Sequence, residues 1–76
     1  MQRDTLLELF RAGDLVRAKV VQTTPDDYVL QFERQNGNHV TMSYTREPGD
    51  KLYKSTHTAA FDANKLGFKN VEVCFA

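Results

Sequence analysis

The sequence predicts an α+β domain in which a small twisted antiparallel sheet is combined with two short helices, one near the N-terminus and one before the last strand. Most of residues 14–45 alternate apolar and polar side chains with the period of two that is typical of strands. Residues 4–12 and 59–66 instead gather apolar side chains in the pattern of short helices. We expect a meander of three or four strands plus a C-terminal strand, in a sheet that could curl toward a partly open barrel.

The first helix is expected to begin at Asp4 or Thr5, either of which can cap it, and to end at Gly13. Its charged residues Glu8 and Arg11 would face solvent. A helix this short is not stable alone, so its apolar face must dock on a larger structure. That face consists of Leu6, Leu7, Leu9 and Phe10.

The first two strands are expected on either side of a turn at residues 23–27, where Pro25 fixes φ and the aspartates can bond nearby backbone amides. Arg17 and Lys19 would lie on the polar face of the first strand. The inward sets would be Val16, Ala18 and Val20 in the first strand and Tyr28, Leu30 and Phe32 in the second, with Val29, Gln31 and Glu33 pointing the other way.

A tight turn at residues 36–38 predicts a third antiparallel strand, because Asn-Gly readily supplies the positive φ angles of a hairpin. After a further turn at residues 48–50, residues 51–54 could form a short fourth strand. The third strand would point Val40, Met42 and Tyr44 inward and Thr41, Ser43 and Thr45 outward.

The second helix is expected between candidate caps at residues 55–58 and a terminating Gly67. Its apolar residues are Ala59, Ala60, Phe61, Ala63 and Leu66. The chain closes with a strand over residues 68–75, which we expect to pair with the first strand or to lie at an edge of the sheet.

With 76 residues, the chain is expected to form one compact domain, residues 1–76. A core of this size leaves little room for a ligand pocket, which usually measures about 300–1,000 Å³. Ten basic and ten acidic residues give a formal net charge of zero. This balance counts against a dedicated nucleic-acid binder, because such domains gain affinity by neutralising phosphates. Size and charge together favour a small binding or regulatory module, such as the accessory proteins of phages and plasmids.

The only cysteine, Cys74, has no second cysteine with which to form an internal disulfide, which suits a reducing cytoplasm. Residues 1–10 carry charges around a short apolar cluster and resemble neither a signal peptide nor a membrane span. We therefore expect a soluble cytoplasmic protein without membrane contact.

Residues suited to catalysis are present, but not in catalytic patterns. Cys74 could be a nucleophile beside a histidine, yet no elbow or helix N-terminus would activate it, so a small packing residue is the favoured interpretation. His39 and His57 match no recurring zinc spacing, and the adjacent Asp26 and Asp27 belong to a turn rather than to opposite sides of a cleft. We expect no enzymatic activity, no metal and no cofactor.

Basic and aromatic residues suggest one alternative. Arg17 and Lys19 project from the same face of the first strand. A basic rim beside a tyrosine would hold single-stranded nucleic acid, with charge along the backbone and rings under the bases. Its further members would be Arg34, Arg46, Lys51 and Lys54, interrupted by Glu33 and Glu47; Tyr28 and Tyr44 have inward parity, which leaves Tyr53 as the aromatic residue least committed to a core.

The stretch GDLVRAKVVQTTPDDYVLQFE, residues 13–33, resembles the first two strands of oligonucleotide-binding barrels of the ribosomal-protein type and of KOW-like barrels. The resemblance consists of a Gly-Asp turn followed by alternating valines, and it does not continue into the later half of the chain. It implies binding of RNA or single-stranded DNA. No individual residue takes a role from it.

The main hypothesis is a non-enzymatic module that engages a protein partner through its sheet face, including Thr41, Ser43 and Thr45, and its charged loops. Binding of RNA or single-stranded DNA is the alternative. A homodimer built over Phe68, Val71, Val73 and Phe75 is a further option. The residues expected to contribute to binding are Arg17, Lys19, Arg34, Arg46, Tyr53 and Lys54.

Overall fold

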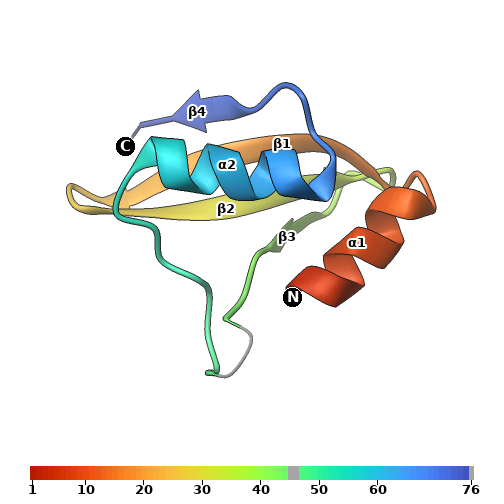
Figure 1. The fold of residues 1–76 in the computed structure, drawn as a ribbon, viewed down its shortest axis with the longest axis horizontal. Helices are drawn as coiled ribbons and strands as arrows, with labels where there is room; N and C mark the ends of the chain where they lie inside the picture. The colour runs from red at the N-terminus through yellow and green to blue at the C-terminus, as the bar shows by residue number, and fades with distance from the viewer. Residues whose placement is uncertain (45–46, 76) are drawn as a thin grey trace.

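The computed structural model describes residues 1–44 and 47–75 and is shown in Figure 1. The predicted α+β class is confirmed, with one helix before the sheet and the other before its last strand. The elements in chain order are α1 (Arg3–Arg11), β1 (Leu15–Thr24), β2 (Asp27–Arg34), β3 (His39–Thr41), α2 (Thr56–Leu66) and β4 (Glu72–Cys74).

The sheet is open and mixed, with the strand order β3-β2-β1-β4. Strands β1, β2 and β3 form the expected antiparallel meander. Strand β4 pairs with β1 and lies at an edge, as expected for the last strand. It runs parallel to β1 and spans only Glu72–Cys74, so the predictions of a wholly antiparallel sheet and of a strand over residues 68–75 are corrected. The sheet is not closed into a barrel. Its two edge strands, β3 and β4, are each three residues long, whereas β1 and β2 have ten and eight.

Residues 51–54 do not form a strand of the sheet. Tyr53 exchanges two backbone hydrogen bonds of 2.8 and 2.9 Å with Tyr28, and Ser43 forms a second isolated bridge with Asp50. After the bridge at Tyr53, the later of the two in the chain, the chain leaves the sheet and runs into α2, as Figure 1 shows. The segment therefore touches the sheet at single residues, where a regular ladder would need several consecutive pairs.

The expectation that Val29 points outward to solvent is wrong in its exposure, since Val29 is only 8% exposed although its register places it on the side away from the helices. The inward alternation of β1 breaks at Val16, which was predicted to face the core and is instead 49% exposed. Leu15 pairs with Arg34 and Arg17 pairs with Glu33, so Val16 is an extra residue in a bulge. The bulge shifts the alternation by one position, and Leu15 takes the buried place. Ala18 and Val20 are buried as predicted.

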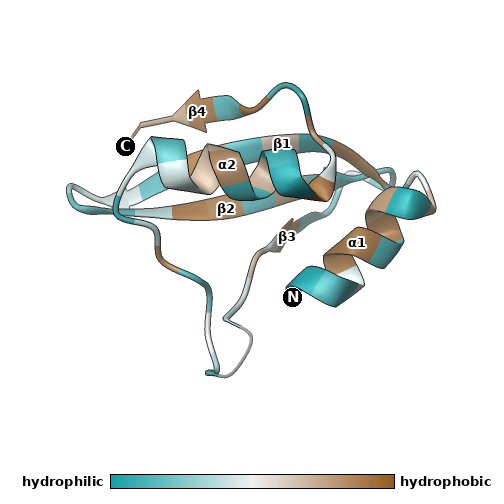
Figure 2. Ribbon diagram, in the orientation of Figure 1, coloured by the Kyte–Doolittle hydropathy of each residue, from teal (hydrophilic) through white to brown (hydrophobic). Residues whose placement is uncertain are grey.

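Both helices lie on one side of the sheet. Helix α2 crosses in front of β1 and β2, and α1 packs against β1 and α2. Figure 2 shows apolar stretches of both strands behind α2. The core combines residues of all these layers: Leu6, Leu15, Ala18, Val20, Leu30, Phe32, Met42, Tyr53, Ala59, Ala63 and Leu66. Within the described ranges, neither helix is long and apolar enough to cross a membrane.

The predicted ends of α2 are confirmed. The Ser55 hydroxyl accepts a hydrogen bond of 3.2 Å from the Thr58 amide, which satisfies one of the free donors at the helix N-terminus. Gly67 ends the helix with a φ of +136°, a value that favours glycine. The ring of Phe10 lies directly over Gly67, in the place that a β-carbon would occupy. The glycine thus lets α1 dock closely against the end of α2.

Candidate functional site

The side of the sheet opposite the helices forms an uncovered surface. Successive side chains of a strand point to opposite faces, and the helices cover the face that carries Ala18 and Phe32. The alternate positions, such as Lys19 and Gln31, therefore point away from the helices. We call this surface the open face; by register it comprises Arg17, Lys19, Val21, Val29, Gln31, Glu33, His39, Thr41, Glu72 and Cys74.

The register arranges the open face in three rows across the strands. The first row runs His39, Glu33, Arg17, and the second runs Thr41, Gln31, Lys19, Glu72. The third is apolar and less accessible, with the buried Val29 beside the half-buried Val21, and Val21 beside the half-buried Cys74. Charged, neutral polar and small apolar groups thus lie within a few ångströms of one another, because paired residues have β-carbons about 4.5–5.5 Å apart.

The charged residues of the open face are not used inside the molecule. Arg17, Lys19, Glu33 and Glu72 form no ion pair within residues 1–44 and 47–75, although two of them are cationic and two anionic. Arg17 and Glu72 are exposed, and Lys19 and Glu33 are half-buried. These four side chains can therefore exchange water for the charges of a partner without first breaking a contact.

A shallow hollow of about 450 Å³ lies at one corner of this surface. Arg17 and Glu72 line it together with Ala18, Asn70 and Val71, which bring in the start of β4 and the loop before it. A charge of each sign at its wall suits a polar side chain of a partner.

Two other predicted binding residues, Arg34 at the end of β2 and Lys54 in the segment before α2, behave differently, because each is held in an ion pair. Arg34 donates to one carboxylate oxygen of Asp14 through Nε at 3.1 Å and Nη2 at 2.6 Å. Lys54 donates to Asp27 at 2.5 Å. The contact with Arg34 lowers the pKa of Asp14, and the contact with Lys54 lowers that of Asp27. These charges are already balanced within the chain.

The predicted site residues therefore do not form one cluster. Arg17 and Lys19 lie together on the open face. Arg34 lies at one end of the β1–β2 hairpin, opposite Leu15, whereas Lys54 reaches Asp27 at the hairpin's other end. Arg46 lies outside the described residues. The predicted continuous basic rim is not formed by the described members of the set.

The expectation for Tyr53 is wrong, because this ring is 2% exposed and belongs to the core. Strand parity placed it outside, but residues 51–54 are not a strand, so parity does not apply to them. Its hydroxyl donates a hydrogen bond of 2.7 Å to Asp62 of α2, and the ammonium of Lys51 donates to the same carboxylate oxygen at 3.2 Å. The group ties residues 51–53 to the helix.

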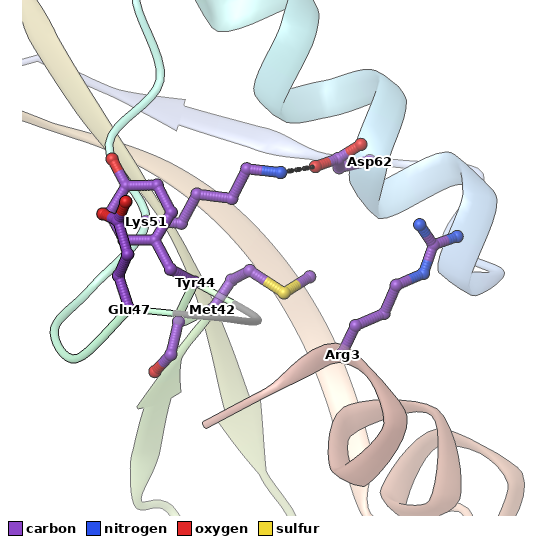
Figure 3. Close-up of a pocket in the computed structure, with 7 residues that line it drawn as sticks. Arg3, Met42, Tyr44, Glu47, Lys51 and Asp62 are labelled. Carbon is purple, nitrogen blue, oxygen red and sulfur yellow. Dashed lines mark hydrogen bonds and ion pairs between the residues drawn. The ribbon is translucent and has the colours of Figure 1, made fainter.

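A second hollow, of about 310 Å³, lies next to this group between α1, α2 and the loop that precedes residue 51. Figure 3 shows Arg3 and Lys51 on its two sides with Asp62 above them. Arg3, Met42, Ser43, Tyr44, Glu47, Lys51 and Asp62 line it.

The ionisable groups of this second hollow are set for structure rather than for proton transfer. Burial disfavours the charge on Asp62, but the hydrogen bonds from Tyr53 and Lys51 outweigh it and lower the pKa of the carboxyl. Burial, together with the Asp62 carboxylate, raises the pKa of Tyr53 far above its ordinary value of 10.0. Around neutral pH, Asp62 is therefore ionised and Tyr53 protonated, whereas a general base works best with a pKa near the operating pH.

The structure keeps the sulfur of Cys74 away from the histidines. Cys74 is half-buried on β4 and His39 lies on β3, with β1 and β2 between them. Three strand spacings correspond to about 14 Å, which is too far for a cysteine–histidine pair. His57 lies in the first turn of α2, on the other side of the sheet. Among the residues that the structure describes, no group of three or more His, Cys, Asp or Glu side chains could hold a metal ion.

Sequence reasoning identified Arg17 and Lys19 but did not propose Gln31, Glu33 or Glu72 as binding residues. The signal for Gln31 and Glu33 was present in the sequence, since they alternate along β2 with the buried Leu30 and Phe32. Glu72 could be placed only after β4 was known to pair with β1 and to set it beside Lys19. The open face is thus assembled from separate parts of the chain.

The chain matches no known protein-family model, and no curated protein or solved structure is significantly similar to it.

Proposed function

We propose that this protein is a non-enzymatic binding module that engages a protein partner through the open face. The observation that carries the proposal is that four charged side chains, two of each sign, stand there without ion pairs, while the loop cations Arg34, Lys51 and Lys54 are paired. Charges of both signs around an apolar row suit another protein surface, because complementary patches fix register and exclude wrong partners.

A nucleic-acid partner fits this surface less well. Phosphate binding favours a surplus of cations, and single strands are held by aromatic rings on which bases stack. On the open face Arg17 and Lys19 are balanced by Glu33 and Glu72, and none of its ten residues is Phe, Tyr or Trp; the imidazole of His39, on the edge strand β3, is the one aromatic ring among them. Tyr28 is half-buried on the helix side of β2, and Tyr44 is half-buried in the loop that follows β3.

The size of the face indicates that neighbouring loops also take part. Strands about 4.8 Å apart, with 10, 8, 3 and 3 residues that each rise about 3.3 Å, give a projected area of about 380 Å². A stable interface usually buries about 800 Å² on each partner. The two ends of the β1–β2 hairpin, held by the pairs Asp14–Arg34 and Asp27–Lys54, are next to the face and provide a rigid charged rim.

The test compares matched double variants in affinity capture from the native cells. The combination of Lys19→Gln with Glu33→Gln removes one charge of each sign from the open face without changing the net charge. The combination of Lys65→Gln with Glu8→Gln makes the same change on the exposed sides of the two helices. A protein captured by the wild type should be lost at least tenfold with the first variant and kept with the second. Equal capture by both variants would overturn the proposal.

A salt titration with a random single-stranded oligonucleotide tests the alternative function, which is binding of RNA or single-stranded DNA. We expect no retention at low salt. Binding that weakens steeply with salt and is lost on Arg17→Gln with Lys19→Gln would instead establish a nucleic-acid surface, because phosphate contacts release counterions.

A further inference from the structure

The two edges of the sheet are protected to different degrees. Beyond β3 the chain is covered on its outer side, since the Ser43 amide donates to the Met1 carbonyl at 2.8 Å and the Lys51 amide donates to the Met42 carbonyl at 2.8 Å. Strand β4 has β1 on one side and is the last strand on the other. Figure 1 shows its outer edge along the rim of the molecule. An uncovered edge strand is a template for pairing with another strand.

The side chains of β4 suit such pairing. Val73 is paired in register with the buried Val20 and therefore points to the helix side, but it is 40% exposed. Phe75 follows two positions later and is 68% exposed, and its ring forms a T-shaped pair with the ring of Tyr28 at 6.4 Å between centroids. Val71, two positions earlier, is half-buried. Three apolar side chains, Val73 in β4 and Val71 and Phe75 on either side of it, thus alternate along an edge that has no further strand among the described residues.

We infer that β4 pairs with β4 of a second copy of this chain, antiparallel and around a two-fold axis through Val73. This inference goes beyond the proposed function and does not depend on it. In this arrangement the axis is perpendicular to the sheet, so the helices of both copies lie on the same side and the two open faces form one continuous surface.

The residues select this register among those a two-fold axis allows. Residues that face each other must lie on the same side of both sheets. The axis therefore passes midway between a residue and the same residue of the second copy. Centred on Val73, the register pairs Val71 of each copy with Phe75 of the other, and Val73 with itself. Centred on Glu72, it would set two carboxylates directly opposite, which is destabilising. Centred on Cys74, it would leave Val71 without a partner among residues 71–75.

The charges near β4 are also compatible with its pairing to a second copy. In the register through Val73, Glu72 faces Cys74 of the second copy and keeps Lys19 of its own chain at its other side. Each chain has a formal net charge of zero, so two copies do not repel one another as a whole. In this register, apolar side chains of one copy face apolar side chains of the other, and no carboxylate faces a carboxylate.

Site-directed disulfide formation tests the register. In a Cys74→Ser background, Val73→Cys places the introduced thiol opposite its own copy, and mild oxidation should give a covalent dimer, because facing β-carbons lie near disulfide distance. Phe75→Cys alone, or Val71→Cys alone, should remain uncrosslinked, whereas a mixture of the two should crosslink. A self-crosslinked Phe75→Cys dimer, or no crosslink with Val73→Cys, would overturn the register.

Sedimentation tests the dimer itself. The wild type should sediment as a dimer at micromolar concentration, and Val73→Lys should be monomeric and folded by circular dichroism, since two ammonium groups would face each other. Val16→Lys is the matched control, because Val16 is also an exposed strand valine but lies in the bulge of β1. A monomeric wild type, or a dimer that survives Val73→Lys, would refute the inference. Affinity capture with the monomeric Val73→Lys variant shows whether the open face binds a partner protein without the dimer.

Discussion

The hydroxyl of Tyr53 donates a hydrogen bond of 2.7 Å to the carboxylate of Asp62, and this contact joins the segment that leaves the sheet to the middle of α2. The Tyr53 ring is buried, and its backbone is bonded to Tyr28 of β2 on the other side. One residue therefore fixes the sheet, the segment before α2 and the helix relative to one another.

Replacing Tyr53 with Phe should lower the free energy of unfolding by about 1–3 kcal/mol, since the hydrogen bond ends on an ionised group that is largely shielded from water. Urea denaturation followed by circular dichroism measures the change. Tyr28→Phe is the matched control, because the hydroxyl of Tyr28 has no hydrogen bond among the described residues, and it should change stability by much less. Equal effects of the two variants would show that the bond to Asp62 contributes little.

Acidification should destabilise the protein in part through Asp62. The pKa of its carboxyl is lowered in the folded state, so its stabilising contribution is complete above the unfolded value, near 3.8, and is lost as pH falls through the lower folded value. The urea midpoint should therefore fall less between pH 5 and pH 2.5 in Asp62→Asn than in the wild type. Asp4→Asn, which removes an exposed carboxylate of α1 that makes no ion pair within the described residues, should show the wild-type decrease.

The Asp14–Arg34 contact can be observed directly by titration. The hydrogen bonds from Arg34, with help from the Gln35 amide, lower the pKa of Asp14. In Arg34→Gln the pKa of Asp14 should rise toward 3.8, as measured by the NMR chemical shifts of its side chain. The pKa of Asp27 should stay lowered, because Lys54 holds it at the other end of the hairpin. A parallel rise at both aspartates would indicate general loosening of the fold instead.

Gly67→Ala should be severely destabilising, by about 3 kcal/mol or more. A β-carbon at Gly67 would overlap the ring of Phe10, and the φ of +136° is strained for any other residue. Gly37→Ala separates the two causes, since Gly37 has a φ of +88° but open space around it, and it should cost about 1 kcal/mol. Thermal unfolding of the two variants measures the difference. Similar losses would mean that α1 moves away from α2 at little cost.

Prediction from the sequence succeeded where local rules decide the outcome. Helix α2 begins at a Ser55 cap and ends at Gly67, as predicted, because both depend on groups within a few residues. It failed at Val16, since a bulge depends on how β1 and β2 pair, and parity along one strand does not reveal it. Tyr53 failed for a related reason, because parity was applied to residues that do not form a strand.

The sequence by itself determined the α+β class, the ends of α2, the meander and most of the alternation along the strands, because these follow from periodicity and turn chemistry over short spans. The expected start of α1 at an Asp4 or Thr5 cap was wrong, since the helix begins at Arg3 after Gln2 and has no side-chain cap. Only the tertiary structure decided that both helices cover the same side of the sheet, that β4 adds in parallel beside β1, and that Arg34 and Lys54 are consumed in ion pairs. These features depend on contacts between residues far apart in the chain, which compete for the same partners and surfaces. The open face and the free edge are products of that competition.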